Sequence, residues 1–185
     1  VIDMRYLFAD AEALSYSIED WDTSNVIAIN YMFRENDTFN QDIGGWDTSN
    51  VIRMFRTFES ADNFNQDISG WDVSNVIDMG YIFRRAYAFN QDIGGWNVSN
   101  LTSMDGMFID ATAFNQDISG WDTSSATDMY RMFDGTFLFD QDLSGWCVSG
   151  VSSKPDRFDI STSSWTGGDA TRPQWGTCPR GEDQN

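Results

Sequence analysis

Carboxylates recur along this chain at a spacing that could hold metal ions. Five aspartates share one position of a 25-residue repeat, at Asp42, Asp67, Asp92, Asp117 and Asp142. If successive repeats stack about 4.8 Å apart, neighbouring carboxylates repel each other by about 1 kcal/mol in water and by several times more near a protein. Three arrangements would offset this: Ca²⁺ between the carboxylates, backbone N–H groups donated to each aspartate at a turn, or a solvated column. The pattern favours turns, with calcium as the alternative and no other cofactor expected.

Three further polar columns have the same period. The first of these columns follows the tryptophans and consists of Asp22, Asp47, Asp72, Asn97 and Asp122. Because Asn97 is neutral, a hydrogen-bond acceptor without charge is sufficient at this position. Another is predicted to satisfy the backbone of a turn: Asn40, Asn65, Asn90, Asn115 and Asp140. A mixed column has the residue types of surfaces that template ice, although only three of its members are threonine: Thr23, Thr48, Val73, Val98 and Thr123.

Catalysis by a pair of carboxylates would need two acids about 5 to 10 Å apart in different environments. Every acid in the columns has several equivalents, whereas a catalytic pair should be singular. The chain contains no histidine, and it has neither a glycine-rich phosphate loop nor a nucleophile elbow. We therefore expect no enzymatic activity.

The tryptophans define the repeat that must position these side chains. They recur at a constant interval without insertion, at Trp21, Trp46, Trp71, Trp96, Trp121 and Trp146. Such a period indicates stacked units that bury their apolar faces against one another. In the fifth copy, Leu101, Met104, Met107, Phe108 and Ala111 have the spacing of one helix face, and the following FNQDISGW has the features of a short strand between turns. We predict an α/β repeat fold, a solenoid with short parallel strands on one face and short helical segments on the other.

The stretch SNVIDMGYIFRRAYAFNQDIGGWNVSNLTSM resembles the BspA-like leucine-rich-repeat surface proteins, in the branch with 25-residue FNQD-and-W repeats found in mycoplasma-type lipoproteins. The resemblance extends from residue 1 to about residue 151. The first copy departs from it, with ALSYSIEDW where the others have FNQDIxGW. The resemblance implies a leucine-rich-repeat-like architecture, display at a cell surface, adhesion or partner binding, and no enzymatic activity.

The end of the chain departs from the repeat. We predict six copies over residues 1–150 and an irregular C-terminal cap over residues 151–185. Cys147 and Cys178 bracket this last segment, and a disulfide between them would stabilise the fold by roughly 3 to 4 kcal/mol. Such a disulfide would point to an extracellular or cell-surface protein. The alternative is two unrelated buried thiols. The chain opens VIDMRYLF, inside a repeat and without a signal peptide, so we expect it to be a piece of a longer protein.

Charge limits the possible partners. The formal net charge of −18 argues against binding to nucleic acid or to an anionic membrane surface, both of which need clustered Lys and Arg. No apolar run approaches the roughly 18 residues that a membrane span needs, so we expect no membrane insertion. The resemblance to surface proteins implies a protein or a glycan at a cell surface as the partner.

Positions that vary between copies are candidates for the partner-binding surface, because the stacking of the repeats does not fix them. They are rich in Tyr and Arg, which are enriched at the centres of protein interfaces. The predicted partner-binding residues are Tyr31, Arg34, Phe55, Arg56, Tyr81, Arg84, Tyr130 and Arg131. The alternative is a solvated face whose aromatics cover the core. A rival function is self-assembly, in which copies stack end to end into fibres through the open edge of the first repeat.

Overall fold

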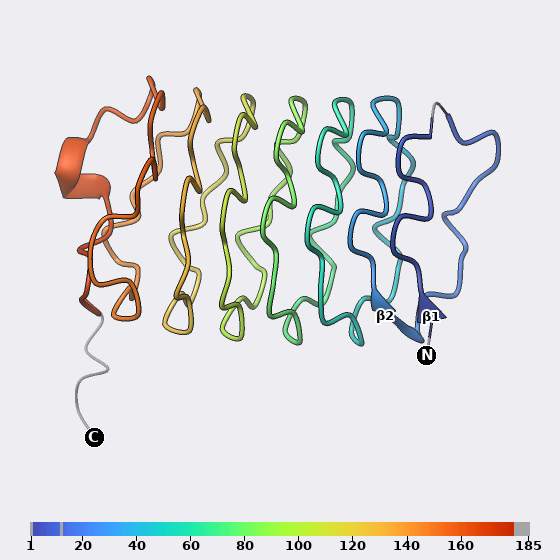
Figure 1. Cartoon of the computed structure of the whole chain (residues 1–185), viewed down its shortest axis with the longest axis horizontal. Coiled ribbons are helices and arrows are strands. Elements are labelled where there is room, and N and C mark those ends of the chain that lie inside the picture. Colours follow the sequence, from blue (N-terminus) through green and yellow to red (C-terminus); the bar gives the residue numbers. More distant parts are fainter. Residues whose placement is uncertain (1, 12, 180–185) are drawn as a thin grey trace.

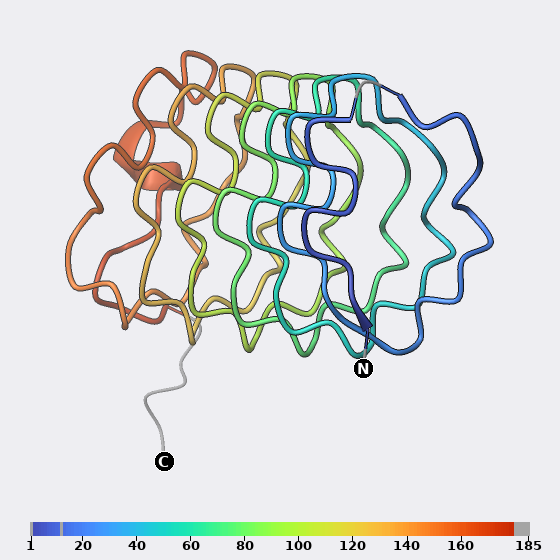
Figure 2. The same cartoon turned by 45° about the vertical axis from the view of Figure 1, so that its right-hand side comes forward.

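The structure of the protein, a computed structural model, describes residues 2–11 and 13–179. The chain forms successive coils that lie side by side along the long axis, from the N-terminal end to the C-terminal end (Figures 1 and 2). Seven coils are marked by a recurring pair of residues with positive φ, for example Tyr31 and Glu35 in the second coil and Arg157 and Ser161 in the seventh. The predicted stacking of 25-residue units is thus observed.

Regular secondary structure is scarce in the described part of the chain. Strands β1 (Ile2–Asp3) and β2 (Val26–Ala28) pair in parallel, with Ile2 opposite Val26 and Asp3 opposite Ala28. The same line of parallel pairing continues as single bridges that join Ala28, Arg53, Asp78, Ser103 and Asp128 in turn. The helical segment is a short 3₁₀ helix, η1 (Gly168–Thr171), near the C-terminal end (Figure 1).

The predicted α/β leucine-rich-repeat-like solenoid of strands and helices is therefore wrong. Residues 101–114, which have the spacing of a helix face, form no helix, because Gly106 and Asp110 have φ angles of +55°. A residue in the left-handed region ends a right-handed helix. Equivalent residues interrupt the other coils in the same way.

Hydrogen bonding between coils explains why turns replace the helix. In the fifth coil the N–H groups of Gly106, Phe108 and Asp110 donate to carbonyl oxygens of the sixth coil at 2.8 to 2.9 Å. The N–H groups between them close turns instead, as when Met107 donates to Met104 O at 3.2 Å. Alternate N–H groups thus bond to the neighbouring coil, whereas in an α-helix every interior N–H group would bond four residues back. Consecutive turns and a helix both place apolar side chains three residues apart, so the sequence pattern fits both.

Columns of aromatic rings fill the core. Phe33, Phe58, Phe83, Phe108 and Phe133 form one continuous stack, with ring centroids 5.5 to 5.8 Å apart. A second stack, which includes Phe64, runs beside it. As predicted from the repeat, Phe64 and Trp71 point inward, with 0% and 3% of their surface exposed.

The recurring FNQD letters join neighbouring coils. The side-chain oxygen of Asn40 accepts the backbone N–H of Asn65 at 2.9 Å, and Gln66 Nε2 donates to the Asn40 carbonyl at 3.0 Å. The next coils repeat this arrangement with Asn65, Asn90 and Asn115 as acceptors. The prediction that the asparagine column satisfies turn backbone is confirmed, and the turn that it satisfies belongs to the next coil.

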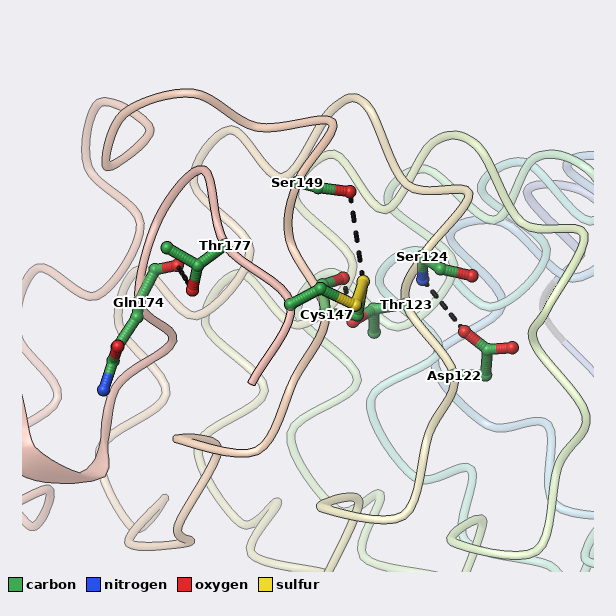
Figure 3. The surroundings of a disulfide bond; sticks show 8 residues. Asp122, Thr123, Ser124, Cys147, Ser149, Gln174 and Thr177 are labelled. Atoms are coloured by element: carbon green, nitrogen blue, oxygen red, sulfur yellow. Dashed lines mark hydrogen bonds between the residues drawn. A yellow bond between two sulfur atoms is a disulfide. The ribbon is translucent and has the colours of Figure 1, made fainter. Parts of the chain in front are cut away.

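The C-terminal segment folds back on the sixth coil. Val148 N–H donates to Thr177 O, and Leu143 N–H donates to Thr171 O, each at 2.8 Å. The predicted disulfide between Cys147 and Cys178 is present and ties this segment to the sixth coil (Figure 3). The division into residues 1–150 and 151–185 stays a prediction, and residues 180–185 lie outside the described residues. Among the described residues, no helix is long and apolar enough to cross a membrane.

Candidate functional site

Six of the eight predicted partner-binding residues lie together in the structure. We call them the aromatic–arginine strip: Tyr31, Arg34, Phe55, Arg56, Tyr81 and Arg84. They come from the second, third and fourth coils, and all six are partly exposed. The Phe55 ring lies edge-on to its two neighbours, with its centroid 5.4 Å from that of Tyr31 and 5.9 Å from that of Tyr81. The strip is therefore continuous across three coils.

Three residues of the aromatic–arginine strip occupy left-handed backbone positions. Tyr31, Arg56 and Tyr81 have φ angles of +60°, +57° and +57°. For residues other than glycine this conformation costs roughly 1 to 2 kcal/mol. Glycine occupies the equivalent position only in the fifth coil, as Gly106, among the seven coils described.

A buried carboxylate that the sequence analysis did not single out organises the strip. Glu59 is 3% exposed and forms ion pairs with three arginines of the strip. Arg56 Nη1 lies 3.1 Å from Glu59 Oε2, and Arg34 Nε lies 3.3 Å from the same oxygen without a well-aligned hydrogen bond. Arg84 Nη1 contacts Glu59 Oε1. The signal was in the sequence, because Glu59 lies one full repeat after Arg34 and one before Arg84, and so had to stack between them.

Tyr130 and Arg131 lie farther along the stack, where Arg131 forms ion pairs of its own and also interacts electrostatically with Tyr81 of the strip. Arg131 Nη2 lies 2.7 Å from Asp134 Oδ2, and Arg157 Nη2 lies 3.0 Å from the same oxygen. Asp134 is buried, whereas Tyr130 is exposed. The structure therefore divides the predicted site into two ion-pair groups, each built around one buried acid.

Both tyrosines of the strip stay protonated at neutral pH. Burial, together with a hydrogen bond to Asp105, raises the pKa of Tyr81 to about 12. Burial and a hydrogen bond with Tyr6 raise the pKa of Tyr31. Burial also raises the pKa of the Asp105 carboxyl, while its hydrogen bond with Tyr81 acts in the opposite direction. Tyr31 and Tyr81 can therefore act only as neutral hydroxyls in recognition.

The aspartate column is explained by turns. Each carboxylate accepts the backbone N–H of the residue two positions later at 2.9 Å, in Asp42, Asp67, Asp92, Asp117 and Asp142. Hydrogen bonds from the serine two positions later lower the pKa of Asp67, Asp117 and Asp142. Among the described residues, no three or more histidine, cysteine or acidic side chains are grouped so as to hold a metal ion.

The mixed threonine and valine column lies inside the protein. Thr23, Thr48, Val73, Val98 and Thr123 are all buried, and Thr48 Oγ1 donates to the Asp72 carbonyl at 3.0 Å. The suggestion that this column forms an ice-templating surface is wrong, because its side chains are buried and do not face solvent.

Comparison with known proteins gives a family and no function. A family model described as "Mycoplasma protein of unknown function, DUF285" matches residues 1–88 and again residues 67–166. Neither the curated proteins nor the solved structures provide a match to the chain.

Proposed function

The chain belongs to the DUF285 family of mycoplasma-type repeat proteins, and from this premise we propose that it is a non-enzymatic recognition module of the cell exterior. It binds a partner macromolecule through the aromatic–arginine strip. The proposal concerns the surface of the stacked coils and does not depend on a leucine-rich-repeat architecture.

The observation that carries this proposal is the choice of residues at the left-handed positions. Glycine adopts a positive φ without steric penalty, and Gly106 demonstrates that the stack accepts it. Tyr31, Arg56 and Tyr81 nevertheless occupy this position in three consecutive coils. Strained positions that keep large side chains are characteristic of functional surfaces. Tyr supplies large contact area at little cost in conformational freedom, and both Tyr and Arg are enriched at the centres of interfaces.

Two features support a location outside the cell. The Cys147–Cys178 disulfide is of the kind that persists in oxidising surroundings. The FNQD-and-W motif resembles that of BspA-like surface proteins, whose proposed role is adhesion. Together they favour display at a cell surface, with a protein or glycan as the partner.

The test compares two variants with the same change in composition. The strip variant carries Arg56→Ala, Tyr81→Ala and Arg84→Ala; the control carries Arg53→Ala, Tyr87→Ala and Arg85→Ala. The three control residues are exposed, and they lie outside the strip. Both variants and the parent protein are applied to glycan and protein arrays and to host cells, after circular dichroism has shown that they are folded. We expect binding to be lost in the strip variant and kept in the control. Equal binding by the strip variant and the parent protein would reject the proposal.

A second candidate function, end-to-end association of copies, is favoured by the first coil. Leu7 is 49% exposed, whereas its equivalents Met32, Thr57, Ile82, Met107 and Met132 are 0% exposed. Within the described residues, the carbonyl oxygens of Arg5, Leu7 and Ala9 accept no hydrogen bond, although their equivalents in the second coil do. This face therefore has the acceptors and the apolar surface of an unpaired coil.

The seventh coil offers complementary donors. The N–H groups of Arg157, Asp159 and Ser161 make no hydrogen bond among the described residues. In the sixth coil, the N–H groups at the equivalent positions donate to the seventh coil. A head-to-tail contact of this kind does not close and would produce filaments. Light scattering at increasing protein concentration tests it, with Leu7→Lys as the blocking variant. A particle size that is constant and equal in both proteins argues against assembly.

A further inference from the structure

The aromatic–arginine strip concentrates positive charge on a strongly acidic protein. We propose that the guanidinium groups of Arg34, Arg56 and Arg84 bind the carboxylates of an acidic segment of a partner protein, with Glu59 as the residue that positions them. The inference rests on the proposed function, because it uses the same strip, and it adds the chemistry of the partner.

The charge of the cluster exceeds what Glu59 requires. The chain has a net charge of −18 and only eleven basic residues, of which three surround this one carboxylate. Arg34 also pairs with Glu35. Asp105, which interacts electrostatically with Arg56, is a third acid near the cluster. A single guanidinium is enough to neutralise the buried Glu59 carboxylate, so an incoming carboxylate competes only with Glu35 and Asp105 for the other two guanidinium groups.

Hydrogen-bond donors also remain available. A guanidinium carries five N–H donors in a planar fork that matches a carboxylate. Glu59 uses Nη1 of Arg56 and Nη1 of Arg84, and among the described residues no acceptor meets Nη2 of either arginine. The three arginine side chains are 28% to 31% exposed, so solvent reaches them. The strip can therefore bind further carboxylates while Glu59 stays in place.

The free protein already holds the arginines in position. The Arg56 guanidinium lies 4.6 Å from the ring centroid of Tyr81 and 5.1 Å from that of Phe55. Arg34 and Arg84 come from the coils on either side of Glu59, and their shared ion pairs fix them relative to each other. Such preorganisation reduces the conformational entropy lost on binding.

The aromatic rings favour an acidic peptide over an acidic glycan. A sugar that stacks on an aromatic side chain needs an open ring face. Tyr31 is stacked on Tyr6, with centroids 4.4 Å apart and ring planes 8° apart, so this face is covered. The Arg56 guanidinium lies over the rings of both Phe55 and Tyr81. Extended peptides do not need such a face, because their carboxylates can reach the guanidinium groups from the side.

In the test, blocked hexaglutamate is titrated into the whole chain, and binding is measured by NMR and calorimetry. Blocked hexaglutamine and a heparin hexasaccharide serve as comparison probes. We expect the parent protein to bind hexaglutamate and not hexaglutamine. Arg84→Gln should weaken this binding about tenfold, as expected for the loss of a charge-assisted hydrogen bond. Arg53→Gln makes the same change in net charge outside the cluster and should leave binding unchanged.

Arg84→Lys keeps the charge but loses the planar fork, and it should bind hexaglutamate more weakly than the parent protein. It also serves as the test if Arg84→Gln does not fold. The inference is overturned if the parent protein does not bind hexaglutamate, if Arg84→Gln and Arg84→Lys bind it as the parent does, or if heparin binds and hexaglutamate does not. If the strip variant still loses array binding in those cases, the proposed function survives and only the carboxylate chemistry fails.

Discussion

Trp71 donates its indole N–H to the carbonyl oxygen of Ile43 in the preceding coil, at 3.0 Å. The same bond, at 3.0 to 3.1 Å, joins Trp46, Trp96, Trp121 and Trp146 to the coil before each of them. The Ile43 oxygen also accepts the backbone N–H of Trp46. Tryptophan therefore fills the core and at the same time fixes the position of one coil on the one before it, which explains why it recurs from the second coil to the sixth.

Trp71→Phe should lower the free energy of unfolding by about 1 to 3 kcal/mol, because it removes this hydrogen bond and part of the buried volume. Trp21→Phe is the matched control, since the Trp21 indole makes no hydrogen bond among the described residues and is only partly buried. Trp21→Phe should lower the free energy of unfolding clearly less than Trp71→Phe does. Urea denaturation followed by circular dichroism measures both. Equal losses would show that the indole N–H does not stabilise the stack.

Two adjacent glycines should respond differently to alanine. A Cβ atom on Gly44 would lie 2.5 Å from the Asp67 carbonyl oxygen in the next coil, whereas a Cβ atom on Gly45 would meet nothing within 4 Å. Gly44→Ala should therefore destabilise the protein by about 1 to 3 kcal/mol, because the coils must move apart. Gly45→Ala should be neutral or stabilise it by up to about 1 kcal/mol. Melting temperatures that fall equally in both variants would contradict close approach of the coils at Gly44.

Asp105 should make the stability of the protein depend on pH. Burial raises the pKa of its carboxyl, and its buried Oδ1 has no hydrogen-bond partner among the described residues. The pKa of Asp105 is higher in the folded protein than in the unfolded chain. Protonated Asp105 therefore contributes its full stability at a pH below the unfolded pKa, and this contribution is lost as the pH rises through the folded pKa. Asp105→Asn should therefore raise the melting temperature at pH 7 more than at pH 3. A gain that is the same at both pH values would contradict the raised pKa.

Loss of the disulfide should loosen the C-terminal end. The Cys147–Cys178 bridge closes a loop across a sequence separation of 31 residues, for which chain entropy gives about 3 to 4 kcal/mol. The double variant Cys147→Ala and Cys178→Ala should lose stability of this size in urea. A reducing agent should affect the parent protein in the same way and leave the double variant unchanged. If reduction does not change the unfolding midpoint of the parent, the bridge does not stabilise the fold.

The periodic columns made part of the fold predictable. Phe64 and Trp71 face inward and Asn40 bonds to the next coil because each has identical neighbours one repeat away, and such columns can only stack. The local conformation was not predictable in the same way. Met104, Met107 and Phe108 fit one face of a helix as well as a series of turns, and only the left-handed backbone at Gly106 and Asp110 separates the two.

The candidate site was likewise only partly predictable. Variation between copies identified Tyr31, Arg56 and Tyr81, because side chains that are free to vary lie at the surface. Glu59 was missed, although its position one repeat after Arg34 and one repeat before Arg84 indicates that it stacks between them. Its importance follows from the ion pairs that form only once coils two to four are stacked.

The repeated bonds between coils imply a characteristic response to mechanical tension. No long helix or strand crosses the described stack, so force applied to the chain ends acts on one coil boundary at a time. The disulfide restrains the C-terminal end, and peeling should therefore start at the first coil. Each detached coil releases one 25-residue repeat, or about 85 Å of extended chain. Under shear, such a protein should lengthen in equal steps as successive coils detach. It should therefore dissipate the load gradually before the C-terminal coil unfolds.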